Sequence, residues 1–242
     1  MKKSKKKVIR KLLPNFILKP LKNTRDIING KNKSELNYWL GRHKLENYKF
    51  SNAHYEKLML SIAEEKDDHF LEGKIVGDFG CGPRGSLSWA KKASAKIGID
   101  CLAESYAKAF PKDLKSHEMI YVNSTEDIIP IQSNFLDIIF TINSIDHVDH
   151  FTSICSEIYR ILKPGGVLYG QLNLEEDSTI CEPQKLNENK IKRNLLSGFE
   201  INHLYLTRKG PPENLYSEFY EKNFEYNLGE EGFMWLKATK LK

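Results

Sequence analysis

Three glycines follow a short apolar run about a third of the way along this chain of 242 residues. Residues 74–85 read KIVGDFGCGPRG, and the β-branched lead-in is typical of a buried strand. Gly80, Gly82 and Gly85 lack a Cβ, which lets a ligand approach the backbone closely. Apolar residues then resume, so the pattern predicts a helix over 86–95 whose first N–H groups are free to bind polar ligand atoms. Strand, glycine turn and helix together indicate a nucleotide-binding loop.

Two side chains beside these glycines bear on the kind of nucleotide. The spacing matches G-x-G-x-x-G, the dinucleotide fingerprint, and Asp100 lies at the expected distance downstream. Asp78, however, stands two residues before the first glycine, where a carboxylate suits a cationic ligand better than a pyrophosphate. Pro83 also removes a backbone donor that a pyrophosphate could use. An NAD-dependent oxidoreductase therefore stays an alternative, and these two residues weigh against it.

The glycine stretch and two later motifs resemble one protein family. DFGCGPRGSL, IGID at residues 97–100 and RILKPGG at residues 160–166 occur in the order and spacing of the class I, Rossmann-like methyltransferases that use S-adenosyl-L-methionine (SAM), of the methyltransferase type 11 kind. The resemblance runs from about residue 74 to the C-terminus. It implies SAM as cofactor and methyl transfer as activity. A non-catalytic SAM-binding scaffold is also open, because a few members of such families bind SAM without using it.

Beyond the glycine turn, strands and helices alternate, which is typical of an α/β fold. An almost continuous apolar run at 135–143 is expected of a central parallel strand covered on both faces. In the segment 163–166, proline should stop a helix and glycine should form its left-handed cap. The predicted elements are strands at 96–100, 118–123, 135–143, 167–174, 199–207 and 232–240, and helices at 103–110, 151–162 and 185–196.

The predicted fold class is α/β, a three-layer αβα sandwich around a seven-stranded, mostly parallel sheet. The resemblance implies that the last strand is antiparallel and lies inside the sheet edge. Helix-spaced apolar residues before the first strand predict an N-terminal helical cover. We divide the chain into a basic amphipathic or disordered tail at 1–30, a helical lid at 31–73 and a Rossmann-like SAM-binding methyltransferase domain at 74–242, with an aromatic loop at 210–231.

The cofactor site is expected beyond the carboxyl ends of the strands, where open α/β sheets bind their ligands. The carboxylate of Asp100 can accept two hydrogen bonds from vicinal ribose hydroxyls. The resemblance puts Cys101 and Leu102 beside the adenine, and an acidic or polar residue among 125–127 at its amino edge. The predicted cofactor-binding residues are Asp78, Gly80, Cys81, Gly82, Pro83, Asp100, Cys101, Leu102, Thr125, Glu126, Asn143 and Ser144.

A histidine is the candidate base for methyl transfer to a hydroxyl. The segment SIDHVDH follows the central strand, and imidazole accepts protons near neutral pH. His147 is the predicted catalytic residue, and Asp146 and Asp149 are expected to orient its ring or that of His150. Carbon or amine acceptors would need no base. No metal site is predicted, because the four cysteines include no C-x-x-C pair.

Residues of the lid and of the segment after the fifth strand are candidates to line the acceptor pocket. In the family that the chain resembles, helices before the first strand close over the cofactor. An aromatic residue on an amphipathic helix is also a common core residue, so packing is the alternative role. The pocket candidates are Trp39, His43, His54 and Tyr55, with Glu182 near the acceptor side.

Positive charge is concentrated at the N-terminus. The net charge is +5, yet residues 1–25 hold ten Lys or Arg and no acid. Interleaved apolar residues are typical of a helix on an anionic membrane surface, where each basic group contributes about 1 kcal/mol. A disordered, solubilising tail is the alternative. Nucleic acid is not an expected partner, because one basic tail on an acidic body makes a poor groove-reading surface.

These observations predict a cytoplasmic enzyme with a possible peripheral position at the inner face of the membrane. Scattered cysteines indicate a reducing compartment, and Pro14 and Lys19 interrupt any signal-peptide core. The expected reaction is SAM-dependent methyl transfer to oxygen of a small-molecule or saccharide acceptor, lipid-linked if the tail meets a membrane. The sequence defines neither the acceptor nor the oligomeric state.

Overall fold

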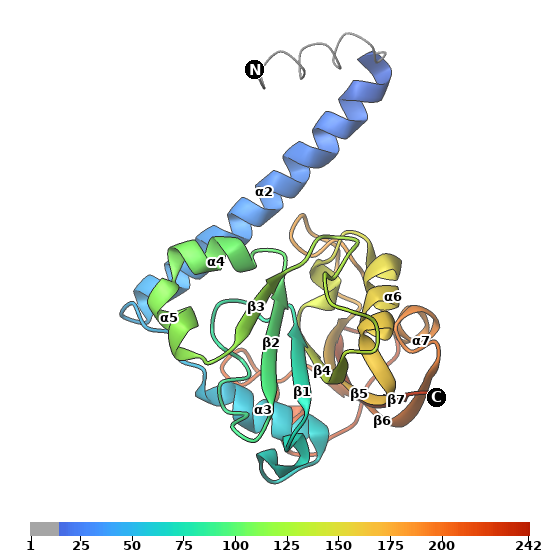
Figure 1. Ribbon diagram of the computed structural model, residues 1–242. Coiled ribbons are helices and arrows are strands. Elements are labelled where there is room, and N and C mark those ends of the chain that lie inside the picture. Colours follow the sequence, from blue (N-terminus) through green and yellow to red (C-terminus); the bar gives the residue numbers. More distant parts are fainter. Residues whose placement is uncertain (1–14) are drawn as a thin grey trace.

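A seven-stranded sheet organises the molecule (Figure 1). The computed structural model describes residues 15–242, with side chains from residue 30 onward. The strand order is β3-β2-β1-β4-β5-β7-β6; β7 is antiparallel to both of its neighbours, and the other pairs are parallel. This confirms the predicted α/β fold with its antiparallel last strand. The strands are β1 Ile75–Phe79, β2 Ala95–Asp100, β3 Ile120–Asn123, β4 Leu136–Ile142, β5 Leu162–Leu174, β6 Phe199–Arg208 and β7 Gly232–Lys240.

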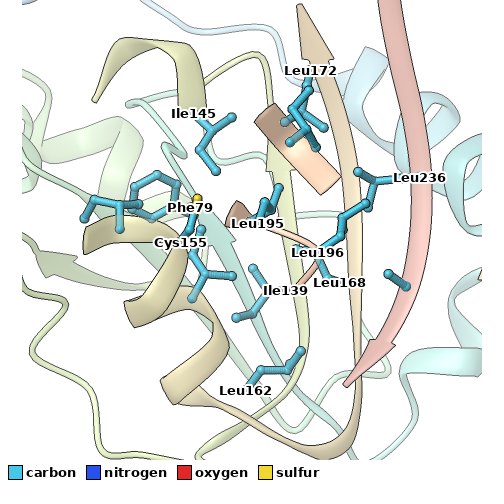
Figure 2. Close-up of a cluster of buried hydrophobic side chains, with 14 of the residues drawn as sticks. Phe79, Ile139, Ile145, Cys155, Leu162, Leu168, Leu172, Leu195, Leu196 and Leu236 are labelled. Atoms are coloured by element: carbon cyan, nitrogen blue, oxygen red, sulfur yellow. The ribbon is translucent and has the colours of Figure 1, made fainter. Parts of the chain in front are cut away.

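Helices cover both faces of the sheet, as the three-layer prediction requires. Buried side chains of α6 and α7 pack on one face, and those of α3 and α8 pack on the other. Figure 2 shows the first of these clusters, where Ile139, Leu168 and Leu236 of three neighbouring strands meet Cys155 of α6. The helices are α2 Asn15–Leu45, α3 Ala53–Ala63, η1 Asp68–Leu71, α4 Ala103–Ala109, α5 Pro111–Ser116, η2 Ile145–His147, α6 Phe151–Ile161, α7 Glu188–Asn194 and α8 Ser217–Tyr220.

The order of the strands reverses at β1, which fixes where a ligand can bind. β1 pairs with β2 on one side and with β4 on the other, so the chain leaves β1 in one direction and later returns to its opposite edge. Loops that follow two such strands diverge and leave a crevice beyond their carboxyl ends. The glycine stretch follows β1 directly, so it borders this crevice.

The predicted helix at 86–95 is wrong. Residues 82–89 form consecutive turns, in which Ser88 N–H bonds the carbonyl of Gly85 at 3.0 Å rather than that of a residue four positions earlier. Gly85 has a φ of +75°, and a Cβ there would overlap the His117 ring. This left-handed backbone does not continue into a helix, and the chain must already pair as β2 at Ala95. Leu87 is nevertheless fully buried, so the turns fill the core space that a helix would fill.

The glycine of 163–166 does not cap α6, contrary to the prediction. The helix ends at Ile161, and its cap is Leu162, whose φ of −77° and ψ of 137° are extended. The segment instead belongs to β5 and bulges out of it, because Leu136 pairs with Leu162 while Ile138 pairs with Val167. Gly165, with a φ of +77°, makes this bulge possible.

α2 spans the predicted boundary between tail and lid at residue 30. The helix runs continuously from Asn15 to Leu45, and its C-terminal half lies against the body near α4 (Figure 1). The division into tail, lid and domain therefore stays a prediction, and residues 1–14 of the basic tail lie outside the described residues. Within residues 15–242, no helix combines the length and the apolar character needed to cross a bilayer.

Candidate functional site

A cavity of about 580 Å³ lies at the carboxyl ends of the central strands, beneath α2 and α3. Its walls come from the loops after β1, β2, β3 and β4 and from the lid helices. All but two of the predicted site residues line it, the exceptions being Asp78 and Pro83. The lining residues from the prediction are Gly80, Cys81, Gly82, Asp100, Cys101, Leu102, Thr125, Glu126, Asn143, Ser144 and His147.

Asp100 ties the glycine loop to the end of β2. Its Oδ2 accepts a hydrogen bond from the N–H of Gly82 at 3.0 Å, and its Oδ1 accepts one from the N–H of Leu102 at 2.8 Å. Each carboxylate oxygen keeps one lone pair for a ligand hydroxyl. Burial raises the pKa of Asp100 to about 6, against which the two backbone hydrogen bonds act. The carboxylate thus lies at the cavity wall with accepting capacity left.

Gly80 allows the ends of β1 and β4 to touch. It has a φ of +74°, and a Cβ there would overlap the side chain of Ser144. Ser144 Oγ in turn donates to the carbonyl of Phe79 at 2.8 Å and lies 2.9 Å from Thr141 Oγ1. The Ser144 hydroxyl therefore joins two strand ends, which leaves little of its hydrogen-bonding capacity for a ligand.

Asp78 lies behind the cavity wall. The hydroxyl of Ser86 donates to its Oδ2, while its Oδ1 is buried and has no hydrogen-bond partner among the described residues. Burial raises the pKa of Asp78 to about 7, with the Ser86 hydrogen bond opposing and the nearby Asp100 adding to the rise. An unpartnered buried acceptor beside the glycine loop fits a cationic ligand group, since a cation would supply the missing partner.

The lid is fastened to the glycine loop through Arg84. Its guanidinium pairs with the carboxylate of Glu46 and donates to the carbonyl of Ser51 at 2.6 Å. The side-chain amide of Asn52 donates to the carbonyl of Gly85 at 3.3 Å. These contacts give the arginine of the P-R-G motif a structural role, because it fixes the segment that joins α2 to α3 to the glycine loop.

Trp39 of α2 lies directly on the loop. A Cβ at Gly82 would come within 3.1 Å of the Trp39 ring, so the absence of a side chain allows the lid to close this tightly. The indole Nε1 donates to Glu35 at 2.9 Å. Gly82 therefore serves the packing of the lid as well as access to the backbone.

Lys31 connects α2 to the loops after β3 and β4. Its side chain is 7% exposed and its Nζ lies 3.1 Å from Asp149 Oδ1 and 3.5 Å from Glu126 Oε1. Glu126 Oε2 also accepts from the N–H of Asp149 at 2.9 Å. Thr125 Oγ1 accepts from the N–H of Ile128 at 2.9 Å. Lys31 was not among the predicted site residues. Nothing in the sequence distinguishes this lysine from the other lysines near it, which lie on the surface of a helix in the usual case.

His147 and Glu182 face each other at the cavity wall. His147 Nε2 lies 3.6 Å from Glu182 Oε1, and both side chains are partly buried. The expectation that Asp146 and Asp149 orient the imidazoles is wrong. Asp146 Oδ2 accepts instead from Asn173 Nδ2 at 3.1 Å, and Asp149 pairs with Lys31.

The second histidine of SIDHVDH lies apart from this pair. His150 Nδ1 is 2.6 Å from Asp127 Oδ1, both side chains are about half exposed, and neither residue lines the cavity. Asp146 does not line the cavity either, and burial raises its pKa above the ordinary value. Of the two histidines in this segment, His147 lines the cavity and His150 does not.

The lid candidates divide between the pocket and the core. Trp39, His54 and Tyr55 line the cavity as expected. His43 does not, because its Nε2 lies 3.1 Å from Asp113 Oδ2 and its ring packs on Phe50. Burial lowers the pKa of His54, and Arg84 adds to this effect, so His54 favours the neutral form.

The aromatic loop contributes one residue to the cavity. Tyr216 lines it, whereas Phe219 stacks on Trp235 at a ring separation of 3.9 Å and belongs to the core. Sequence reasoning also missed Tyr106, which is almost fully buried at the cavity wall. The periodic apolar pattern that predicts its helix contains no sign that this one ring also borders a ligand.

Residues 77–170 match the family model of a methyltransferase domain. The malonyl-[acyl-carrier protein] O-methyltransferase of Enterobacter lignolyticus is 32% identical over 94 residues, 38% of this chain and 36% of that protein. The mitochondrial ubiquinone biosynthesis O-methyltransferase of Mus musculus is 26% identical over 125 residues, 47% of this chain and 32% of that protein. The chain thus spans about a third of the length of these two relatives.

A solved structure shares the fold. Geranyl diphosphate C-methyltransferase from Streptomyces coelicolor, in complex with S-adenosyl-L-homocysteine, superposes with a TM-score of 0.55 at 14% identity, over 78% of this chain and 77% of that one. At this identity the likeness concerns the fold alone. Together with the match to the domain model, it agrees with the motifs around the glycine loop. Residues 77–170 therefore resemble a methyltransferase domain in sequence, and the chain shares the fold of this methyltransferase structure.

Proposed function

We propose that the protein is an enzyme that transfers a methyl group from SAM to oxygen of a small-molecule or saccharide acceptor. The observation that carries the proposal is one cavity of about 580 Å³ bordered both by the glycine loop with Asp100 and by His147. A donor and an acceptor can lie end to end in such a space. Aligning two reactants and excluding water can lower a barrier by about 7–11 kcal/mol.

The cofactor end supports SAM through charge and hydrogen bonding. Asp100 has lone pairs left for ribose hydroxyls, and the Asp78 carboxylate behind the cavity wall would favour the ammonium group through its charge rather than by direct contact. Cys101 and Leu102 would flank the adenine, with Thr125 or Glu126 at its amino edge. When bound, SAM supplies an electrophilic methyl group. The chain's own residues bind, orient and shield the reactants.

The acceptor end supports methylation at oxygen. His147 lines the cavity, so it can accept the proton of a bound hydroxyl, and two of the curated relatives are named O-methyltransferases. Tyr55 and Tyr216 offer ring surfaces of the kind that sugars and other compact acceptors pack against. The lid at 31–73 encloses this end and favours a compact acceptor over a long polymer.

Calorimetric titration with SAM, S-adenosylhomocysteine and NAD tests the cofactor. We expect SAM and its demethylated product to bind and NAD not to bind. Asp100→Asn should weaken SAM binding at least about tenfold, because an amide cannot accept both backbone hydrogen bonds. Asp177→Asn, a change at a carboxylate that is 95% exposed, is the matched control. Binding of NAD alone would favour an oxidoreductase. SAM binding without incorporation of tritiated methyl groups into a cell extract would favour a scaffold.

The basic N-terminus supports a peripheral position on an anionic membrane, and a lipid-linked acceptor would then be within reach. Residues 1–25 carry ten basic side chains and no acid. Sedimentation with anionic liposomes, with and without these residues, tests the idea. Loss of binding on truncation is the expected result, and equal binding by both forms contradicts it.

A further inference from the structure

Glu182 is placed to act on His147 rather than on the cofactor. Their facing atoms, Oε1 and Nε2, are 3.6 Å apart, and Nε2 is buried without a hydrogen bond among the described residues. Catalytic hydrogen bonds are often long before substrates bind and shorten in the complex. Since Nε2 faces a carboxylate, the neutral ring is favoured with its proton on Nε2, which leaves the lone pair on Nδ1.

The segment that carries Glu182 is anchored beside the segment that carries His147. A tight turn holds Glu182 itself, whose N–H and carbonyl both bond Thr179 at 2.9 Å. Two residues later, the Gln184 side-chain amide donates to the carbonyls of Val148 at 3.0 Å and Asp149 at 3.1 Å. Its own N–H donates to the carbonyl of Asp146 at 3.2 Å. Carboxylate and imidazole are therefore held by one hydrogen-bonded unit.

The charge of the cavity also selects among acceptors. Glu35, Asp100, Glu126 and Glu182 line it, and the lysine among the described lining residues, Lys31, is already paired. A carboxylate or phosphate at the reacting end of an acceptor would meet like charges with no free cation to bind it. A neutral hydroxyl meets no such cost. It does need a base, which an ionised carboxylate acceptor would not.

We propose that Glu182 is a positioning residue that holds His147 in the Nε2–H form for deprotonation of a neutral hydroxyl acceptor and that excludes anionic acceptors. The inference rests on the proposed methyl transfer. The hydroxyl proton passes to Nδ1 of His147, and the oxygen electron pair forms the bond to the methyl carbon. The bond from methyl to sulfur breaks and leaves its electron pair on sulfur. Glu182 stabilises the resulting imidazolium through its opposite charge.

The tautomer of His147 is a direct test that requires no turnover. ¹⁵N NMR of the free protein in alkaline buffer should show the Nε2–H form in the wild type and a mixture in Glu182→Ala. Asp177→Ala, which removes a solvent-exposed carboxylate from the same loop, should leave the spectrum unchanged. A wild-type ring protonated on Nδ1 overturns the assignment, as does an identical tautomer in Glu182→Ala.

The products of methyl transfer test the choice of acceptor. Protein incubated with tritiated SAM and cell extract should form alkali-stable methyl ethers, and Glu182→Ala should lower their yield at least about tenfold while SAM affinity stays within about twofold. Glu182→Gln, which removes only the charge, should raise the share of alkali-labile methyl esters. Predominant esters in the wild type would overturn this inference and leave methyl transfer standing. A protein that binds SAM but methylates nothing would overturn both.

Discussion

The parts of the cavity that we propose for the cofactor and for the acceptor, called here the cofactor end and the acceptor end, are built differently. At the cofactor end, short strand termini meet through backbone groups: Asp100 bonds the N–H of Gly82, and Ser144 bonds the carbonyl of Phe79. At the acceptor end, side chains from distant segments converge, as where His147 meets Glu182. Backbone contacts between strand ends persist when surface residues change, because the sheet fixes them. Side-chain contacts between loops depend on each residue, so this is the end where specificity can vary.

Removal of His147 should give the largest effect and should be confined to the acceptor end. For His147→Ala we expect turnover to fall by about 10²–10⁴-fold, the usual contribution of a general base, with SAM affinity unchanged. Initial rates of methyl incorporation and calorimetric titration measure the two quantities separately. His150→Ala is the control, because this ring pairs with Asp127 outside the cavity and should leave the rate within about twofold. Normal turnover of His147→Ala would remove it from the mechanism.

The pH dependence of stability should reveal the buried carboxylate at the cofactor end. The pKa of Asp78 is about 7 in the folded protein against an ordinary 3.8, so between these values the folded state holds a proton that the unfolded state has lost. Its contribution to the free energy of unfolding is therefore complete below pH 3.8 and is lost as the pH rises to about 7. This loss amounts to at most about 4 kcal/mol.

Urea denaturation of the wild type and Asp78→Asn across this pH range measures the effect. The variant should show a smaller decrease in stability towards pH 7. Asp137→Asn is a control of opposite sign, because a hydrogen bond from the N–H of Ile75 and the pairing with Lys163 lower the pKa of Asp137. The stability that Asp137 contributes is present above its unfolded pKa and is lost as the pH falls through its folded pKa. Parallel pH profiles for wild type and Asp78→Asn would contradict the assignment.

The sequence places the glycine loop and Asp100 at this cavity because their signals are local. Glycines, an aspartate at a strand end and a buried apolar strand follow one another within a few residues, and each has a restricted conformational use. Sequence reasoning failed at 86–95, where apolar residues suggested a helix. The segment forms turns because Gly85 has a left-handed backbone and lies against the His117 ring. This contact cannot be read from the local pattern, since His117 is distant in sequence.

The acceptor end was predicted only in part, since its contacts join segments far apart. The sequence places His147 and Glu182 each near the acceptor, but no spacing shows that these two residues, 35 positions apart, face each other. The expected partners, Asp146 and Asp149, were chosen because they are neighbours in sequence. Asp146 bonds Asn173 and Asp149 pairs with Lys31 instead, and both of these partners lie far away in the sequence.

Exchange of the arginine in the glycine loop should loosen the lid and thereby affect the cofactor end. Arg84→Lys is expected to weaken SAM binding about tenfold, since a lysine cannot pair with Glu46 and also bond the Ser51 carbonyl in the same planar geometry. Calorimetry with SAM measures the loss. Arg42→Lys is the matched control, because Arg42 bonds the same Glu46 but is 43% exposed, and its affinity should stay near that of the wild type. An equal loss of SAM affinity in both variants would mean that neutralising the charge of Glu46 matters, and that the contact between Arg84 and the Ser51 carbonyl does not.

The smallest expected effect comes from two lid histidines, one that packs in the core and one that lines the cavity. His43 looked like a pocket residue in the sequence, yet it packs against Phe50 and pairs with Asp113. His43→Ala should therefore lower the free energy of unfolding by about 1–2 kcal/mol and leave SAM affinity and turnover within about twofold. His54→Ala should instead lower SAM affinity or turnover and leave the free energy of unfolding nearly unchanged. His54 lines the cavity, so its truncation removes contact area from a bound ligand. Because both are lid histidines, denaturation and titration of this pair show whether the lid contributes through its fold or through its contacts.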